Sequence, residues 1–246
     1  MNGIQYGNRC IGNECSIDKM SSYLREYPTG YFTPTDYDLI AWYKMEPTSI
    51  TYDANGISKV NDLSGNDYHL LQAVDANKPA FLSVNSIGTS VYDGANTFMN
   101  VDFGVTHAQP FTIFLLFKTI VNVNQFVYDS FSSIDRNFMY MWSDDKIHYS
   151  AGVELTYSKV KPFNYIVSCV IPNGVNSTVY ENGVSKITGN LGARSISGIT
   201  LGASYIPSAF FNGSIAEMFI IDGVLSTADR QLFESYLNDK RVQLIG

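Results

Sequence analysis

The 246-residue sequence predicts an all-β sandwich of antiparallel strands. Hydrophobic residues make up 45% of the chain and charged residues only 16%, with 17 tyrosines and 15 phenylalanines, and aromatic residues favour half-buried strands. From residue 39 onwards, short apolar segments alternate with turn residues at the spacing typical of a sandwich. Because one all-β domain can fill this length, we expect a single domain over residues 37–246, preceded by an N-terminal arm over residues 1–36.

The arm differs from the rest of the chain in composition. It begins with glycine, asparagine and cysteine residues, continues with a helical segment expected over residues 16–27, and ends in a stretch containing Pro28, Gly30 and Pro34. We interpret it as a docking segment.

The three cysteines cannot all pair within one chain, so no disulfide framework is expected. Cys10 and Cys15 would need two further ligands to hold a metal ion, and the histidines do not obviously supply them. Cys169 shares a strand face with apolar residues and is interpreted as a small buried hydrophobe.

Three local patterns define strands within the domain. Residues 111–117 are apolar at both parities, which predicts a central strand covered on both faces. Residues 138–142 and 146–149 flank a polar turn and predict a hairpin. A second hairpin is predicted at Asn182-Gly183, because this pair readily takes positive φ at both central positions of a type I′ turn.

The end of the chain predicts one strand and one short helix. Residues 214–221 alternate as a strand that leaves Glu217 in an apolar row. Ser226 can cap the following helix, and Lys240 and Arg241 suit its C-terminus. Its buried stripe is expected to contain Leu232, Phe233, Tyr236 and Leu237.

Several short segments between residues 37 and 240 carry a family resemblance in their order and spacing. They are residues 38–43, 60–66, 78–79, 91–94, 111–117, 180–183, 199–202, 211–217 and 223–226. Together they resemble the laminin-G-like branch of the concanavalin A-like lectins and glucanases. The resemblance implies a two-sheet jelly roll, of a kind found in polysaccharide-binding domains, adhesins and bacteriophage virion proteins. Fold alone does not choose among these functions.

The sequence offers no catalytic constellation. Some jelly-roll relatives hydrolyse glycans with a Glu-x-Asp-x-x-Glu strand, and that pattern is absent. The nearest strand contains Glu217, whereas Asp222 falls on the opposite face, and a glycosidase needs two carboxylates around one bond. Glu217 is therefore interpreted as structural, satisfied by a cation or a backbone N–H. We expect the protein not to be an enzyme, and a glycan hydrolase or lyase is the least favoured alternative.

Sugar recognition would need exposed aromatic rings beside polar side chains. Five aromatic residues lie in or near predicted loops or strand edges and are the candidate ligand-binding residues: Tyr205, Phe210, Phe211, Trp142 and Tyr128. Packing or subunit contact is the alternative interpretation of the same residues. Trp42, on the first predicted strand, is expected in the core.

No cofactor is required by any motif, although calcium held by loop oxygens is common in the family that the sequence resembles. Weak calcium candidates are Asp93, Asn100, Asp102 and Asp135, with Asn96 and Asp222 as further oxygen donors. The alternative is that these residues are present because they form turns.

Charge and hydropathy restrict the partners. The net charge is −7 and no Lys/Arg cluster occurs, so nucleic acid is not expected. The longest strongly apolar run is too short to cross a bilayer. The N-terminus lacks the basic start and apolar stretch of a secretory signal, which predicts that the protein is made in the host cytoplasm.

The favoured hypothesis is a non-enzymatic adhesion or structural protein of a phage virion. The domain would bind glycan or neighbouring subunits as a homo-oligomer, for example on a tail fibre or as a capsid decoration. The arm would dock it to other virion proteins. The alternative is a carbohydrate-binding module of a bacterial polysaccharide-processing system, at the cell surface or outside the cell.

Overall fold

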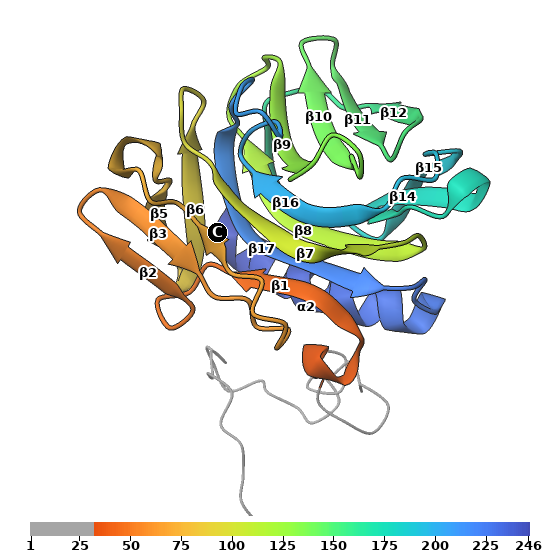
Figure 1. The fold of residues 1–246 in the computed structure, drawn as a ribbon, viewed down its shortest axis with the longest axis horizontal. Coiled ribbons are helices and arrows are strands. Elements are labelled where there is room, and N and C mark those ends of the chain that lie inside the picture. Colours follow the sequence, from red (N-terminus) through yellow and green to blue (C-terminus); the bar gives the residue numbers. More distant parts are fainter. Residues whose placement is uncertain (1–31) are drawn as a thin grey trace, which may run out of the picture. The chain divides into compact units, whose positions relative to one another are not determined.

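Two antiparallel sheets lie face to face in the part of the chain that the structure, a computed structural model, describes, residues 32–246 (Figure 1). Residues Pro34 to Gly246 form one compact unit. The sequence predictions for Cys10, Cys15, the helix over residues 16–27 and most of the arm lie outside the described residues. The all-β sandwich with a C-terminal helix is confirmed.

The first sheet has the strand order β15-β14-β13-β8-β17-β6-β5, and β1 pairs with the C-terminal half of β17. Its strands are β1 (Leu39–Lys44), β5 (Ala80–Val84), β6 (Ile87–Asp93), β8 (Phe111–Thr119), β13 (Phe163–Ile171), β14 (Ser177–Glu181), β15 (Val184–Gly189) and β17 (Asn212–Asp222).

The second sheet has the order β12-β11-β10-β9-β16-β7-β4-β3-β2. Its strands are β2 (Ile50–Asp53), β3 (Gly56–Val60), β4 (Leu70–Leu71), β7 (Met99–His107), β9 (Gln125–Ser130), β10 (Phe138–Trp142), β11 (Lys146–Ser150), β12 (Glu154–Ser158) and β16 (Ile196–Leu201). The helical elements are three short 3-10 turns, η1 (Pro34–Asp36), η2 (Asp75–Asn77) and η3 (Gly174–Asn176), and the helix α2 (Thr227–Ile245).

Strand β8 is central and covered on both faces, as predicted. Ile113 and Leu115 face the second sheet and belong to the core between the sheets. Phe114 points the other way and stacks on Phe233 of α2 at 5.1 Å between ring centroids. Cys169 is also fully buried, and this burial raises the pKa of its thiol. Its interpretation as a small core residue is confirmed.

Both predicted hairpins are present. Strands β10 and β11 pair across the turn 143–145. Strands β14 and β15 pair across Asn182 and Gly183, whose φ angles of 50° and 80° are those that a type I′ turn requires.

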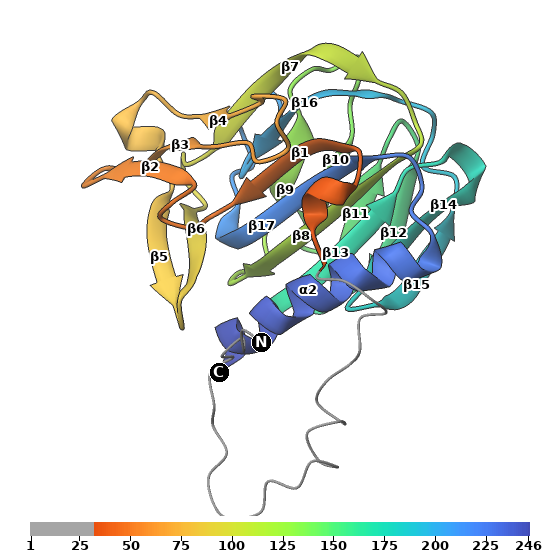
Figure 2. The same cartoon turned by 90° about the horizontal axis from the view of Figure 1, so that it is seen from below.

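Helix α2 packs along the first sheet, over β13, β8 and β6 (Figure 2). Its N-terminus is capped as predicted, because the Ser226 hydroxyl accepts a hydrogen bond from the Asp229 N–H at 3.1 Å. The helix has 19 residues and continues to Ile245. The placement of Lys240 and Arg241 at its C-terminus was therefore wrong. The Lys240 side chain instead forms an ion pair with a carboxylate on β17.

That carboxylate belongs to Glu217, a residue that is only 1% exposed. It accepts hydrogen bonds from the Trp42 indole N–H at 2.7 Å and from the Tyr236 hydroxyl at 3.1 Å, and it forms an ion pair with Lys240. The structural interpretation of Glu217 is confirmed. Trp42 is half-buried and stacks on Phe219 at 5.2 Å, so it lies at the helix side of the sheet and not between the sheets.

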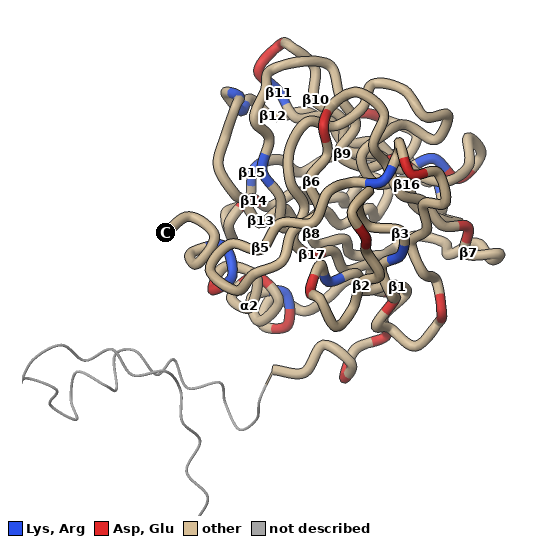
Figure 3. The backbone as a smooth tube through the Cα atoms, turned by 90° about the vertical axis from the view of Figure 1, so that its left-hand side faces the viewer, with Lys and Arg blue, Asp and Glu red and all other residues tan. Residues whose placement is uncertain are grey.

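Basic residues are scattered among acidic ones over the fold (Figure 3). Within residues 32–246, no helix is long and apolar enough to span a membrane.

We predict that Glu217→Gln lowers the free energy of unfolding by about 3 kcal/mol, because it leaves the half-buried Lys240 ammonium with only the more distant Glu46 carboxylate as counter-charge. Urea denaturation measures the change. The matched control is Lys44→Gln, which removes a partly exposed pair with Glu46 and should cost less than about 1 kcal/mol. Equal losses in the two variants would contradict the assignment.

Candidate functional site

A row of aromatic side chains lies on the face of the second sheet that points away from the first. Side chains alternate along a strand, and Met139 and Met141 of β10 belong to the core between the sheets. Phe138, Tyr140 and Trp142 therefore lie on the opposite face. Of these, Trp142 is the most accessible, with 49% of the residue exposed.

Strand β9 continues this row. Phe126 lies 4.3 Å from Tyr140 and 5.6 Å from Phe138 between ring centroids, and Tyr140 in turn lies 6.0 Å from Trp142. We call Phe126, Phe138, Tyr140 and Trp142 the aromatic row. Aromatic pairs at such separations stabilise one another, so the row is a continuous apolar surface.

One guanidinium group lies over the end of the aromatic row. The Arg136 guanidinium carbon lies 5.0 Å from the Phe138 ring, 5.4 Å from the Phe126 ring and 4.9 Å from the ring of Tyr205. These are cation–π distances. Arg136 therefore joins Tyr205, in the loop between β16 and β17, to the row on β9 and β10.

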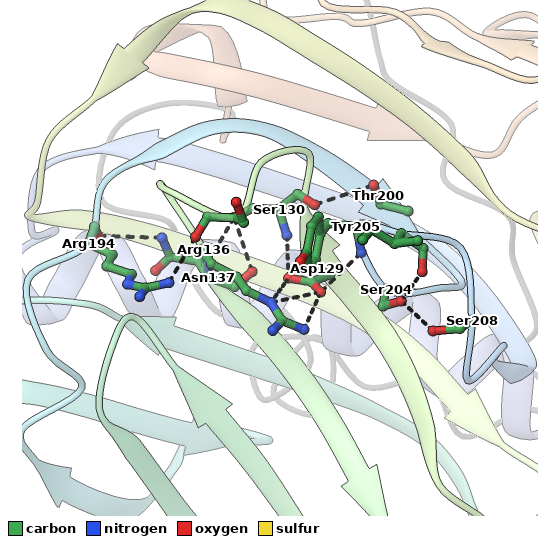
Figure 4. A network of polar contacts seen from close by, with 11 residues as sticks. Asp129, Ser130, Arg136, Asn137, Arg194, Thr200, Ser204, Tyr205 and Ser208 are labelled. Carbon is green, nitrogen blue, oxygen red and sulfur yellow. Dashed lines mark hydrogen bonds and ion pairs between the residues drawn. The ribbon is translucent and has the colours of Figure 1, made fainter.

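Asp129 of β9 holds Arg136 in place (Figure 4). Its buried carboxylate accepts the Arg136 Nε–H at 3.1 Å and the Nη2–H at 2.8 Å. It also accepts the backbone N–H groups of Ser130 at 2.9 Å and Tyr205 at 3.1 Å. Burial raises the pKa of Asp129, and the Arg136 guanidinium opposes that shift. The loop that presents Tyr205 is thus tied directly to the sheet.

Further hydrogen bonds fix the two loops around this pair. The Ser204 and Ser208 hydroxyls lie 2.8 Å apart in the Tyr205 loop. The Asn137 side-chain amide donates to the Ser195 carbonyl oxygen, and the Asn137 backbone N–H donates to the Ser130 hydroxyl at 2.7 Å (Figure 4). The site is therefore largely pre-formed, which favours ligand binding because less order has to be gained.

A depression of about 510 Å³ opens beside Tyr205. Strand β7, the loop between β9 and β10, and the start of β16 form its walls. Its lining residues are mainly polar or small: Asp102, Gly104, Val105, Thr106, Phe131, Ser132, Ser133, Asp135, Ser197 and Tyr205. Tyr205 contributes both to the depression and to the stack on Arg136, so the two features are adjacent.

The Trp142 ring is supported from behind by a histidine. His148 of β11 is buried and stacks on Trp142 at 5.4 Å with an interplanar angle of 23°. Its Nδ1 lies 2.8 Å from a Glu154 carboxylate oxygen, and its Nε2 lies 3.2 Å from one of Asp144. These contacts fix the plane against which Trp142 rests.

Two of the predicted aromatic candidates lie in this site, namely Trp142 and Tyr205. The placement of Tyr128 and Phe211 near the surface was wrong, since their residues are only 2% and 0% exposed. The pairing of β9 with β10 is irregular between Phe126 and Tyr128, which turns Phe126 outward and Tyr128 into the core. Phe211 immediately precedes β17 and packs on Tyr92 and Phe117.

Phe210 is half-buried against Phe98, at 6.4 Å, and is not part of the row. Sequence analysis missed Phe126, Phe138, Tyr140 and Arg136. The alternation Phe138-x-Tyr140-x-Trp142 contained the signal for two of them, because it places three aromatic rings on one strand face.

Only two of the four calcium candidates within the described residues share one depression. Asp102 and Asp135 both line the depression, and Asn100 lies on β7. Asp93 accepts the Ala95 backbone N–H at 2.9 Å within its own turn. Among residues 32–246, no three His, Cys, Asp or Glu side chains are grouped to hold a metal ion.

Comparison with known proteins identifies the fold. No protein-family model and no curated protein matches the sequence. Domain 4 of AbnA, an extracellular arabinanase from Geobacillus stearothermophilus solved with arabinotriose, matches with a TM-score of 0.56 and 15% identity. The match covers 80% of this chain and 98% of that domain.

Two botulinum neurotoxin structures match over 82% of this chain. One is of type C, whose cell entry is described as dependent on two ganglioside molecules, with a TM-score of 0.60 and 14% identity. The other is the serotype G binding domain, with a TM-score of 0.59 and 11% identity. This chain spans about half of each, 52% and 51%. The chain therefore has the β-sandwich fold that these binding domains share.

We predict that Asp129→Asn lowers the free energy of unfolding by about 2 kcal/mol, because the Arg136 guanidinium loses a buried charged partner. It should also make the loop around Tyr205 more sensitive to limited proteolysis. The control is Asp135→Asn, whose carboxylate accepts one exposed hydrogen bond from Thr106 and should change stability by less than about 0.5 kcal/mol. An unaltered loop in the Asp129 variant would refute this role.

Proposed function

We propose that the protein is a non-catalytic carbohydrate-binding protein, and that it holds its glycan on the aromatic row and in the adjoining depression. The observation that carries this proposal is the exposed Trp142 ring, continued by Tyr140 and flanked by the carboxylates of Asp144 and Glu154. A sugar ring presents an apolar face of C–H groups and an edge of hydroxyls. An aromatic surface beside hydrogen-bonding groups complements both.

The solved structures support binding as the activity. The type C neurotoxin is described as interacting with gangliosides, and the arabinanase domain was solved in complex with arabinotriose. Glu217, the carboxylate that a hydrolase hypothesis would use, is enclosed under α2 on the other sheet. The enclosure of Glu217 therefore supports a binding protein over a glycan hydrolase.

We predict that Trp142→Ala weakens glycan binding at least tenfold, because an exposed aromatic ring against which a ligand packs commonly contributes about 2 kcal/mol. A glycan array followed by titration calorimetry on the best ligand measures the loss. Tyr52→Ala is the matched control, since Tyr52 is similarly exposed but lies on β2, at the far edge of the second sheet. A ligand that binds both variants equally well would place the site elsewhere.

The setting that we propose is display on a phage virion, as a homo-oligomer with residues 1–36 docking the domain to other virion proteins. Its support is the distinct composition of that arm. A second setting, a binding module of a bacterial polysaccharide-processing system at the cell surface or outside the cell, is favoured by the near-complete coverage of the arabinanase domain.

The two settings differ in what the arm does. In the virion setting, the full chain should assemble or attach to a particle, and a variant lacking residues 1–33, which leaves the unit Pro34–Gly246 whole, should not. Light scattering and electron microscopy compare the two. A full chain that stays monomeric and binds no particle would favour the module.

A further inference from the structure

Resting on the proposed function, we infer that the ligand is an extended, uncharged glycan chain that runs along β10 and is held at both ends of that strand. One end is the Trp142 platform and the other is the depression beside Tyr205. The inference follows from the separation of the two ends, the continuity of the surface between them and the charges at each.

The two ends lie at opposite ends of β10. Trp142 is its last residue, next to the turn to β11, whereas the loop 131–137 that lines the depression precedes its first residue, Phe138. A strand rises about 3.3 Å per residue, so Phe138 and Trp142 are separated by about 13 Å along the strand. One sugar ring is too small to contact both ends, and several linked rings are needed.

The surface between the ends is continuous. From Trp142 it passes to Tyr140 and Phe126, then to the Arg136 guanidinium and to Tyr205, and each step between neighbouring groups is 6.0 Å or less. All are aromatic rings or a flat guanidinium. Such a surface offers successive sugar rings a repeated apolar contact without requiring one orientation of their hydroxyls.

The depression is acidic. Asp102 and Asp135 line it, and none of its lining residues is basic. The nearby Arg136 is already neutralised by Asp129 through a bidentate pair. Arg194 donates to the Ser133 carbonyl oxygen at 3.0 Å and is the remaining cation beside the depression, so the two carboxylates outnumber it. Carboxylates accept hydrogen bonds from sugar hydroxyls and repel other carboxylates. Neutral sugars are therefore favoured there over uronic or sialic acids.

Carboxylates also surround the Trp142 platform. Asp144 and Glu154 flank it by contacting the His148 ring behind it. Two cations lie at this end: Lys146, the cross-strand neighbour of Trp142, and Lys161, whose ammonium donates to the carbonyl oxygens of Trp142 and Lys146. They are matched by Asp144, Asp145 and Glu154. This end therefore offers hydroxyl acceptors and no net positive site for an anionic sugar.

The test uses the full chain and two series of linear oligosaccharides, from disaccharide to hexasaccharide. The neutral series contains arabino-, xylo- and gluco-oligosaccharides, and the acidic series contains oligogalacturonates. Titration calorimetry is expected to show affinity for a neutral chain that rises at least tenfold with length and then levels off. Acidic chains of equal length should bind at least tenfold more weakly.

Variants then assign the two ends. Trp142→Ala and Tyr205→Ala should each lower affinity for the longest neutral ligand at least tenfold and leave a similar residual affinity for short and long chains. Tyr52→Ala should keep the length dependence. Phe138→Leu and Asp129→Asn are not used as variants, because either change would disturb the packing or the hydrogen bonds that hold the aromatic row in place.

The outcomes separate the two proposals. Neutral chains bound with the same affinity at every length, or acidic chains bound more tightly than neutral ones, would overturn the extended neutral ligand and leave carbohydrate binding intact. Failure of every chain in both series to bind would overturn both.

Discussion

Strand β8 is apolar on both faces, and burying both faces requires two covering layers. The second sheet covers one face and α2 covers the other, which is why Phe114 stacks on Phe233 while Ile113 lies between the sheets. Burial of this strand makes the first sheet the closed side of the molecule. Helix α2 lies on the first sheet, and within residues 32–246 it leaves the outer face of the second sheet free for the proposed glycan contact.

The helix can lie on the first sheet because one buried charge is neutralised. Glu217 stands in the row of β17 that α2 covers, where an unpaired carboxylate would be costly. Lys240 from the helix, together with the Trp42 and Tyr236 donors, satisfies it. The same residue that a hydrolase hypothesis would recruit for catalysis therefore attaches the helix to the sheet.

On the second sheet a similar buried pair holds the candidate site together. Asp129 fixes Arg136, and Arg136 connects the aromatic row with Tyr205. Within residues 32–246, Arg136 is the cation that stacks on the row, and Asp129 neutralises it. The rigidity of the candidate site thus arises from one interaction.

Local patterns in the sequence determined the parts that depend on neighbours along the chain. The Asn182-Gly183 turn, the Ser226 cap and the two-sided apolar strand were readable because each reports a local backbone or burial preference. The exposure of an individual aromatic ring could not be read from the sequence. Tyr128 and Phe126 are two residues apart, and the irregular pairing of β9 with β10 decides which of them faces the core. Register and loop packing depend on contacts between distant segments, as in the junction of Asp129, Arg136 and Tyr205, and only the tertiary structure could supply them.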